Sequence, residues 1–169
     1  AALIESLRIG RGPKGLSIAT GDVNDSYPFH SFKMLITFLN ALRGNTYLKR
    51  FDLWNGHSCH GIPQSLATAL HDHEGLTRLG LHGCTLDERC WYQLLRSISL
   101  HPSLQRLRFN NIFSQEMPVI RDRTKSLADM LSVNKQVEEI IYDGITFDLA
   151  YWDRNVAPRL DYNLYRPLL

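Results

Sequence analysis

The chain has 169 residues, which is enough for one domain with a buried core. Its formal net charge is +2, and 21% of its residues are charged. This near-neutral balance excludes the overall basic field that marks many nucleic-acid-binding proteins. No run of about 18 apolar residues is present, so we expect no membrane-spanning helix.

The cysteines and the first residues of the chain favour a cellular compartment and indicate whether the chain is a fragment. Cys59, Cys84 and Cys90 form an odd set without paired spacing, which argues against a disulfide framework and favours a reducing, cytoplasmic compartment. The first residues, AALIESLRIGRG, lack the basic start and long apolar stretch of a signal peptide. We expect residues 1–169 to form a single domain that is a fragment of a longer protein.

Residues 1–28 predict an irregular repeat followed by an inserted loop. Ile4, Leu7 and Ile9 have the spacing apolar-x-x-apolar-x-apolar, which recurs further along the chain. The segment from Gly10 to Pro28 is polar and contains glycine and proline, which is typical of a loop. This interpretation makes Ile4–Ile9 a strand.

Repeats follow over residues 29–147. Four segments share apolar residues at their first, fourth and sixth places, and their starts are separated by 28, 28 and 33 residues. They are LKRFDLWNG from Leu48, LTRLGLHGC from Leu76, LQRLRFNNI from Leu104 and VEEIIYDGI from Val137. This alternation predicts a short strand in each unit.

A helix is predicted before each strand. Apolar residues lie ten and six positions before each start, a four-residue spacing that places both on one helix face. These are Phe38, Leu66, Leu94 and Leu127, then Leu42, Leu70, Ile98 and Leu131. A polar residue lies three positions before each start, where the helix should end: Asn45, His73, His101 and Asn134.

Such units predict an α/β solenoid. One unit is too small to bury its apolar stripe alone, so the units stack and the strands form a parallel sheet. Helices need more room than strands about 4.8 Å apart, so the sheet should lie on the concave side and the helices on the convex side of a right-handed horseshoe.

Two irregular regions complete the chain. The 33-residue spacing implies five extra residues, which we assign to a loop between Ile112 and Arg123. Residues 148–169 break the repeat and predict a C-terminal cap. The cap's expected apolar face, bent at Pro158, comprises Phe147, Leu149, Trp152, Val156, Leu160 and Leu164.

The segment LTRLGLHGCTL, from Leu76 to Leu86, matches L-x-x-L-x-L-x-x-N/C-x-L at every apolar position. With helix-bearing 28-residue units, the chain resembles the ribonuclease-inhibitor-like class of leucine-rich-repeat proteins. The stretches RTKSLADMLSVNKQVEEI and NVAPRLDYNLYRP resemble the last repeat and cap of diatom leucine-rich-repeat proteins, which implies no particular activity. Gly56, Ile112 and Ile145 depart from the consensus where Cys84 fits it.

Side chains at the third, fifth and seventh places of each strand should point out of the concave face. The third-place column, Arg50, Arg78, Arg106 and Glu139, is called the arginine column below. The irregular repeat would add Ser6, Arg8 and Gly10. Our candidate partner-binding residues are Arg50, Asp52, Trp54, Arg78, His82, Arg106, Arg108, Asn110 and Glu139.

Two interpretations of this face stay open. In-register arginines beside Trp54 suit an acidic protein partner, because Trp and Arg are enriched at binding hot spots. The alternative is a solvated face in which Arg50 pairs with Asp52 and Arg106 with Glu139. A structural spacer and, less favoured, an RNA- or phosphate-binding surface are the other functions considered.

Catalytic and metal sites find little support. Cys59, His60, His71 and His73 lack the spacing of zinc ligands. Cys84 and Cys90 are expected to be packing residues, while Asp87, Glu88 and Asp148 should open helices. We therefore predict a non-catalytic protein-interaction scaffold without metal, cofactor, small-molecule substrate or membrane contact.

Overall fold

The computed structural model describes residues 2–19, 32–43, 45–54, 62–71, 73–84, 86–112, 120–145 and 147–160. Helices and strands alternate along these residues. They are α1 (Ala2–Arg8), β1 (Gly15–Ala19), α2 (Phe32–Leu42), β2 (Arg50–Trp54), α3 (Ile62–His71), β3 (Arg78–His82), α4 (Glu88–Ser99), β4 (Arg106–Asn110), α5 (Ile120–Val133), β5 (Glu139–Asp143), α6 (Leu149–Asn155) and the 3-10 turn η1 (Ala157–Arg159).

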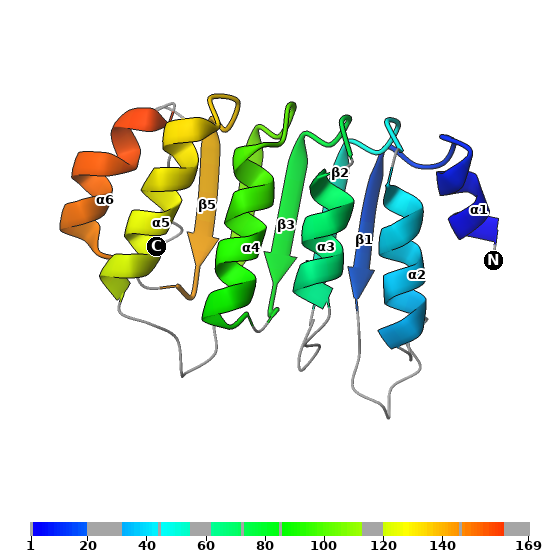
Figure 1. Cartoon of the computed structure of the whole chain (residues 1–169), viewed down its shortest axis with the longest axis horizontal. Helices are drawn as coiled ribbons and strands as arrows, with labels where there is room; N and C mark the ends of the chain where they lie inside the picture. The colour runs from blue at the N-terminus through cyan, green and yellow to red at the C-terminus, as the bar shows by residue number, and fades with distance from the viewer. Residues whose placement is uncertain are drawn as a thin grey trace.

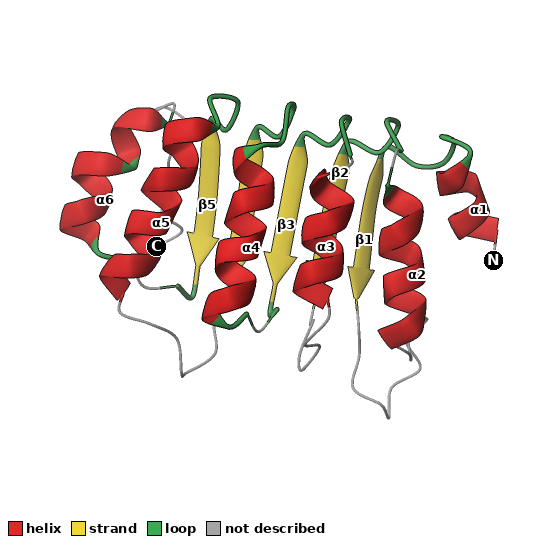
Figure 2. Ribbon diagram, viewed as in Figure 1, coloured by secondary structure: helices red, strands yellow, loops and turns green. Residues whose placement is uncertain are grey.

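The strands form one parallel sheet in chain order, β1-β2-β3-β4-β5. Helices α2 to α5 all lie on the same side of this sheet, with α1 and α6 at its two ends (Figures 1 and 2). This is the predicted α/β solenoid of leucine-rich-repeat type. The sheet face turned away from the helices, which carries the third, fifth and seventh places of each strand, is called the open face below.

The core lies between the sheet and the helices. All the predicted repeat columns are buried there, from Phe38 and Leu42 in α2 to Leu127 and Leu131 in α5. The residues at the first place of each repeat, from Leu48 to Val137, are at most 2% exposed. Every repeat therefore buries an apolar residue at each of these places, and this burial holds the helices to the sheet. In the described part of the chain, no helix is long and apolar enough to cross a membrane.

The polar residues at the helix ends form a buried column, called the turn column below: Asn45, His73, His101 and Asn134. Asn45 Oδ1 accepts hydrogen bonds from the backbone N–H groups of Tyr47 and Leu48, both at 2.9 Å. His73 Nδ1 accepts from the N–H groups of Gly75 and Leu76 in the same way. Each side chain thus satisfies backbone donors where the chain turns from helix to strand.

The asparagines and the histidines of the turn column differ in their other hydrogen bonds. The amide of Asn134 also donates to the carbonyls of Ile98 and His101, at 2.6 and 3.2 Å. The Nε2 atoms of His73 and His101 are buried without a hydrogen-bond partner. Burial lowers the pKa of both histidines to about 4, so both imidazoles are neutral at neutral pH.

The prediction for the first 28 residues is wrong in its register. Ile4 and Leu7 lie on helix α1, and β1 lies within the segment that was predicted to be a loop. Gly15 is aligned with Arg50, so Pro13 occupies the first place of this repeat. Because a proline replaces the usual leucine, the strand pattern is disguised, while a three-residue apolar spacing fits a helix as well as a strand.

This correction moves the first-repeat residues of the open face. Ser6, Arg8 and Gly10 are not strand residues, and Gly15, Ser17 and Ala19 take their places beside β2. Leu7 instead occupies the helix column of Leu42 and is 1% exposed. The remainder of the predicted loop, residues 20–28, lies outside the described residues, as do residues 113–119 of the loop assigned between Ile112 and Arg123. Ile120 to Asp122, also assigned to that loop, form the first turn of α5 instead.

Part of the apolar face predicted for the C-terminal cap is buried, and the cap as a whole stays a prediction. Phe147, Trp152, Val156 and Leu160 are buried at the end of the solenoid. Leu149 is 62% exposed, contrary to the prediction, because it is the first residue of α6 and directly follows the N-cap Asp148. Leu164 lies outside the described residues.

Candidate functional site

Asp52, Gly80 and His82 form a compact polar group on the open face. Asp52 Oδ2 is 2.6 Å from Arg50 Nε and accepts a 3.3 Å hydrogen bond from Ser17 Oγ. His82 Nε2 is 3.8 Å from Asp52 Oδ1. A Cβ at Gly80 would overlap Asp52 Oδ1 and lie 2.8 Å from His82 Nε2, so only glycine leaves room for both side chains.

Trp54 stacks on this group. Its ring lies on the imidazole of His82, with centroids 3.9 Å apart and planes 8° apart. Trp54 is 41% exposed, whereas His82 and Asp52 are 2% and 4% exposed. Burial, together with Arg108, lowers the pKa of His82, so the stacked imidazole is neutral. The two buried residues therefore position Trp54, which presents the accessible surface.

The arginine column is compensated at its two ends. Arg106 Nε lies 3.1 Å from Glu139 Oε2, and Arg50 is paired with Asp52. These are the two pairs expected of a solvated face. Within the described residues, Arg78 and Arg108 form no ion pair.

A hollow of about 200 Å³ lies over β2 to β5 on the open face. Six charged residues line it: Arg50, Asp52, Arg78, Arg106, Arg108 and Glu139. Leu79, Leu107 and Ile141 form its apolar part. The hollow therefore joins paired and unpaired arginines on one surface.

Eight of the nine candidate residues thus fall into three groups. Trp54, Arg78 and Arg108 are exposed, Asp52 and His82 are buried supports, and Arg50, Arg106 and Glu139 are paired. Asn110 is half-buried and aligned between His82 and Asp143. Two further contributors were not predicted as site residues. Ser17 was hidden by the misplaced first strand, and Ile141 lacks the polarity used to select the others.

Among the described cysteines and histidines outside this face, Cys84, Cys90, His73 and His101 are buried. Cys84 is buried, and burial with Asp87 nearby raises the pKa of Cys90 to about 11, so that thiol is protonated at neutral pH. His71 is exposed and His73 is buried, while Cys59 and His60 lie outside the described residues. Where the structure is described, no three potential metal ligands cluster.

Two of the three predicted helix-opening acids are confirmed as N-caps. Asp87 accepts a 2.7 Å hydrogen bond from the Cys90 N–H, and Asp148 accepts a 2.9 Å bond from the Tyr151 N–H. Glu88 lies in the first turn of α4. All three acids therefore have a local structural explanation.

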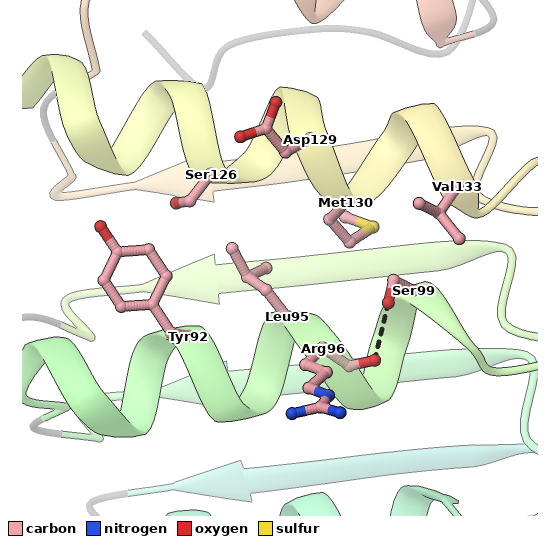
Figure 3. A pocket seen from close by; sticks show the side chains of 8 residues that line it. All are labelled: Tyr92, Leu95, Arg96, Ser99, Ser126, Asp129, Met130 and Val133. Atoms are coloured by element: carbon pink, nitrogen blue, oxygen red, sulfur yellow. Dashed lines mark hydrogen bonds between the residues drawn. The ribbon is translucent and has the colours of Figure 1, made fainter.

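A second hollow lies on the helical side, between α4 and α5 (Figure 3). It has a volume of about 270 Å³ and lies among apolar groups such as Leu95, Met130 and Val133. Its serines are already bonded, Ser99 to the carbonyl of Arg96 and Ser126 to Trp91 Nε1 and the carbonyl of Arg123. The hollow also contains Tyr92, Arg96 and Asp129, so its polar residues carry charge of both signs, whereas four of the six charged residues of the open-face hollow are arginines.

Sequence comparison relates the chain to leiomodins. Over 118 residues, 70% of this chain, it is 26% identical to leiomodin-2 of Gallus gallus. Leiomodin-3 of Homo sapiens is 27% identical over 79 residues, 47% of this chain. The matches span only 20% of leiomodin-2 and 14% of leiomodin-3. No protein-family model matches the chain.

Structural comparison shows the same fold. The solved structure titled leiomodin-1 actin-binding site 2 has a TM-score of 0.70 and 21% identity, covering 96% of this chain and 87% of that one. The C-terminal domain of Caenorhabditis elegans tropomodulin has a TM-score of 0.76 and 17% identity, covering 96% and 91%. The leucine-rich-repeat architecture is thereby confirmed. The resemblances to the ribonuclease-inhibitor-like class and to diatom proteins stay predictions.

Proposed function

We propose that this chain is a non-catalytic protein-interaction domain that binds actin through the open face of its sheet. The observation that carries the surface assignment is the exposed Trp54, stacked on His82 beside the unpaired Arg78 and Arg108. A rigid aromatic side chain next to arginines is the composition of a binding hot spot. We expect the contacted part of the partner to be acidic and the protein to be cytoplasmic.

The choice of actin rests on the relatives. The leiomodin-1 domain of the same fold is titled an actin-binding site, and the sequence matches are also to leiomodins. The matched region is a small part of those longer proteins. The proposal therefore concerns binding by this domain and no other activity of a leiomodin.

The test is co-sedimentation with actin filaments, together with size-exclusion chromatography with monomeric actin. Binding should weaken at least about tenfold in Trp54→Ala and in Arg78→Glu/Arg108→Glu, since hot-spot residues carry most of the binding energy. Arg121→Glu/Lys125→Glu, at two exposed positions of α5, changes the net charge equally and should bind normally. Reversing Arg50 or Arg106 is less informative, because it would place a carboxylate beside Asp52 or Glu139.

Two outcomes contradict different parts of the proposal. If neither filaments nor monomers bind the unmodified chain, actin is not its partner. If actin binds and the Trp54 and arginine variants bind equally well, the contact surface is not the open face.

A further inference from the structure

The hollow on the open face carries more positive than negative charge. Each of its two carboxylates already contacts an arginine, Asp52 with Arg50 and Glu139 with Arg106. Arg78 and Arg108 are exposed, and neither has an ion-pair partner among the described residues. The surplus is therefore concentrated on these two side chains.

The repeat pattern explains why they stay unpaired. In β2 the fifth place is Asp52, which lies two residues after Arg50 and pairs with it. The same place is Gly80 in β3 and Arg108 in β4. Arg78 is aligned with Arg50 and Arg106, so the neighbouring strands supply like charge instead of a carboxylate.

We propose that Arg78 and Arg108 form an anion subsite that receives a carboxylate side chain of the partner protein. This proposal rests on the proposed use of the open face and names the chemistry that the face recognises. The planar guanidinium group suits a carboxylate because it can donate two parallel hydrogen bonds. Ile141, half-buried on β5, offers an apolar contact to a residue next to the acidic one.

The size and surroundings of the hollow favour a protein side chain as the occupant. Its volume of about 200 Å³ is below the about 300–1,000 Å³ typical of small-molecule pockets. Single-stranded nucleic acid is bound by a long basic groove with several stacking aromatics. On the strands of this open face, Trp54 is the exposed large aromatic, and the chain's net charge is only +2.

The experiment uses the full chain with arginine side chains labelled by nitrogen-15. The probe is a blocked peptide of alternating glutamate and leucine, and its control is the same peptide with glutamine for glutamate. Titration followed by the arginine Nε–H signals should shift those of Arg78 and Arg108 first. The affinity should fall when salt is raised from about 10 mM to about 150 mM, because exposed charges are screened. The glutamine peptide should bind at least about tenfold more weakly.

Variants test the residues directly. Arg78→Gln/Arg108→Gln should weaken binding of the acidic peptide at least about tenfold, and Arg121→Gln should leave it unchanged. Arg78→Lys/Arg108→Lys should give intermediate affinity, since lysine keeps the charge and loses the planar fork. All these positions are exposed, so circular dichroism should show folded variants.

The outcomes separate this proposal from the proposed function. Equal binding of the glutamine peptide, or equal binding by the double glutamine variant, overturns the subsite. Inorganic phosphate or a short RNA that binds the same arginines more tightly than the acidic peptide also overturns the carboxylate assignment. If the subsite fails while actin binding persists, the proposed function stands. If peptide binding holds while actin fails to bind, the subsite stands and the named partner is wrong.

Discussion

The turn column and the arginine column both cross the solenoid with one polar residue per repeat, yet their environments are opposite. Asn45, His73, His101 and Asn134 are at most 4% exposed and bond to the backbone. In the arginine column Arg50 and Arg78 are exposed, and Arg106 and Glu139 are half-buried. Changes in the turn column should therefore alter stability, and changes in the arginine column should alter binding.

This difference shows that a repeated polar residue in a solenoid has no fixed meaning. A buried polar side chain must be bonded, so its column is held by the need to satisfy backbone donors. An exposed arginine needs no partner, because water solvates it and like charges about 4.8 Å apart repel only weakly there. The four predictions below follow this contrast from the largest expected effect to the smallest.

The largest effect is expected from acid, through the two histidines of the turn column. The pKa of His73 and His101 is about 4 in the folded chain, against an ordinary value of 6.5. The unfolded chain therefore binds more protons below pH 6.5, and stability should fall as the pH drops from 6.5 to 4. At about 1.4 kcal/mol per pKa unit, each histidine should account for a loss of about 3 kcal/mol.

The neighbouring repeats supply the control. The double variant His73→Asn/His101→Asn copies the residues of the first and last turns, Asn45 and Asn134. Urea unfolding at pH 7 should give a free energy within about 1 kcal/mol of the unmodified chain, because asparagine can make the same acceptor bonds. Between pH 6.5 and 4 the variant should lose distinctly less stability. Parallel pH curves for the two proteins would contradict the assignment to these histidines.

The second prediction concerns Asn134, which makes the most hydrogen bonds in the turn column. Asn134→Ala removes two donors and the acceptor of the Gln136 and Val137 N–H groups. The free energy of unfolding should fall by about 2–4 kcal/mol, since buried backbone groups lose their partners. Urea denaturation measures it, with Asn40→Ala on the exposed side of α2 as the control. A loss no larger than the control's would mean that water replaces the amide.

The repeats reveal most of the fold and only part of the site. Periodicity placed the buried columns from Phe38 to Val137 correctly, because each place has one environment in every repeat. It failed at β1, where Pro13 replaces the first leucine. It also could not show that Trp54 stacks on His82. That stack depends on Gly80, which lies between Asp52 and Arg108 in the sheet and has no side chain to crowd Asp52 and His82.

The third prediction concerns the space that Gly80 leaves for the side chains of Asp52 and His82. Gly80→Ala should destabilise the chain by about 1–3 kcal/mol, because the added methyl group overlaps the Asp52 carboxylate and crowds His82. The Trp54 indole N–H signal should shift as the stack moves. Gly15→Ala is the matched control on the same face, since its Cβ would lie 3.7 Å from Arg50 Cβ, an ordinary contact. Equal stability of the two variants would show that Asp52 and His82 can move apart freely.

The smallest effect on stability should come from Glu139, the acidic residue at the end of the arginine column. Glu139→Gln removes the partner of Arg106, whose side chain is 39% exposed, so the loss should stay below about 1 kcal/mol. The same change frees a third arginine in the hollow and should strengthen binding of the glutamate–leucine peptide. Glu138→Gln changes the net charge equally at an exposed position outside the strand. Equal gains in the two variants would mean that overall charge, and not the hollow, attracts the peptide.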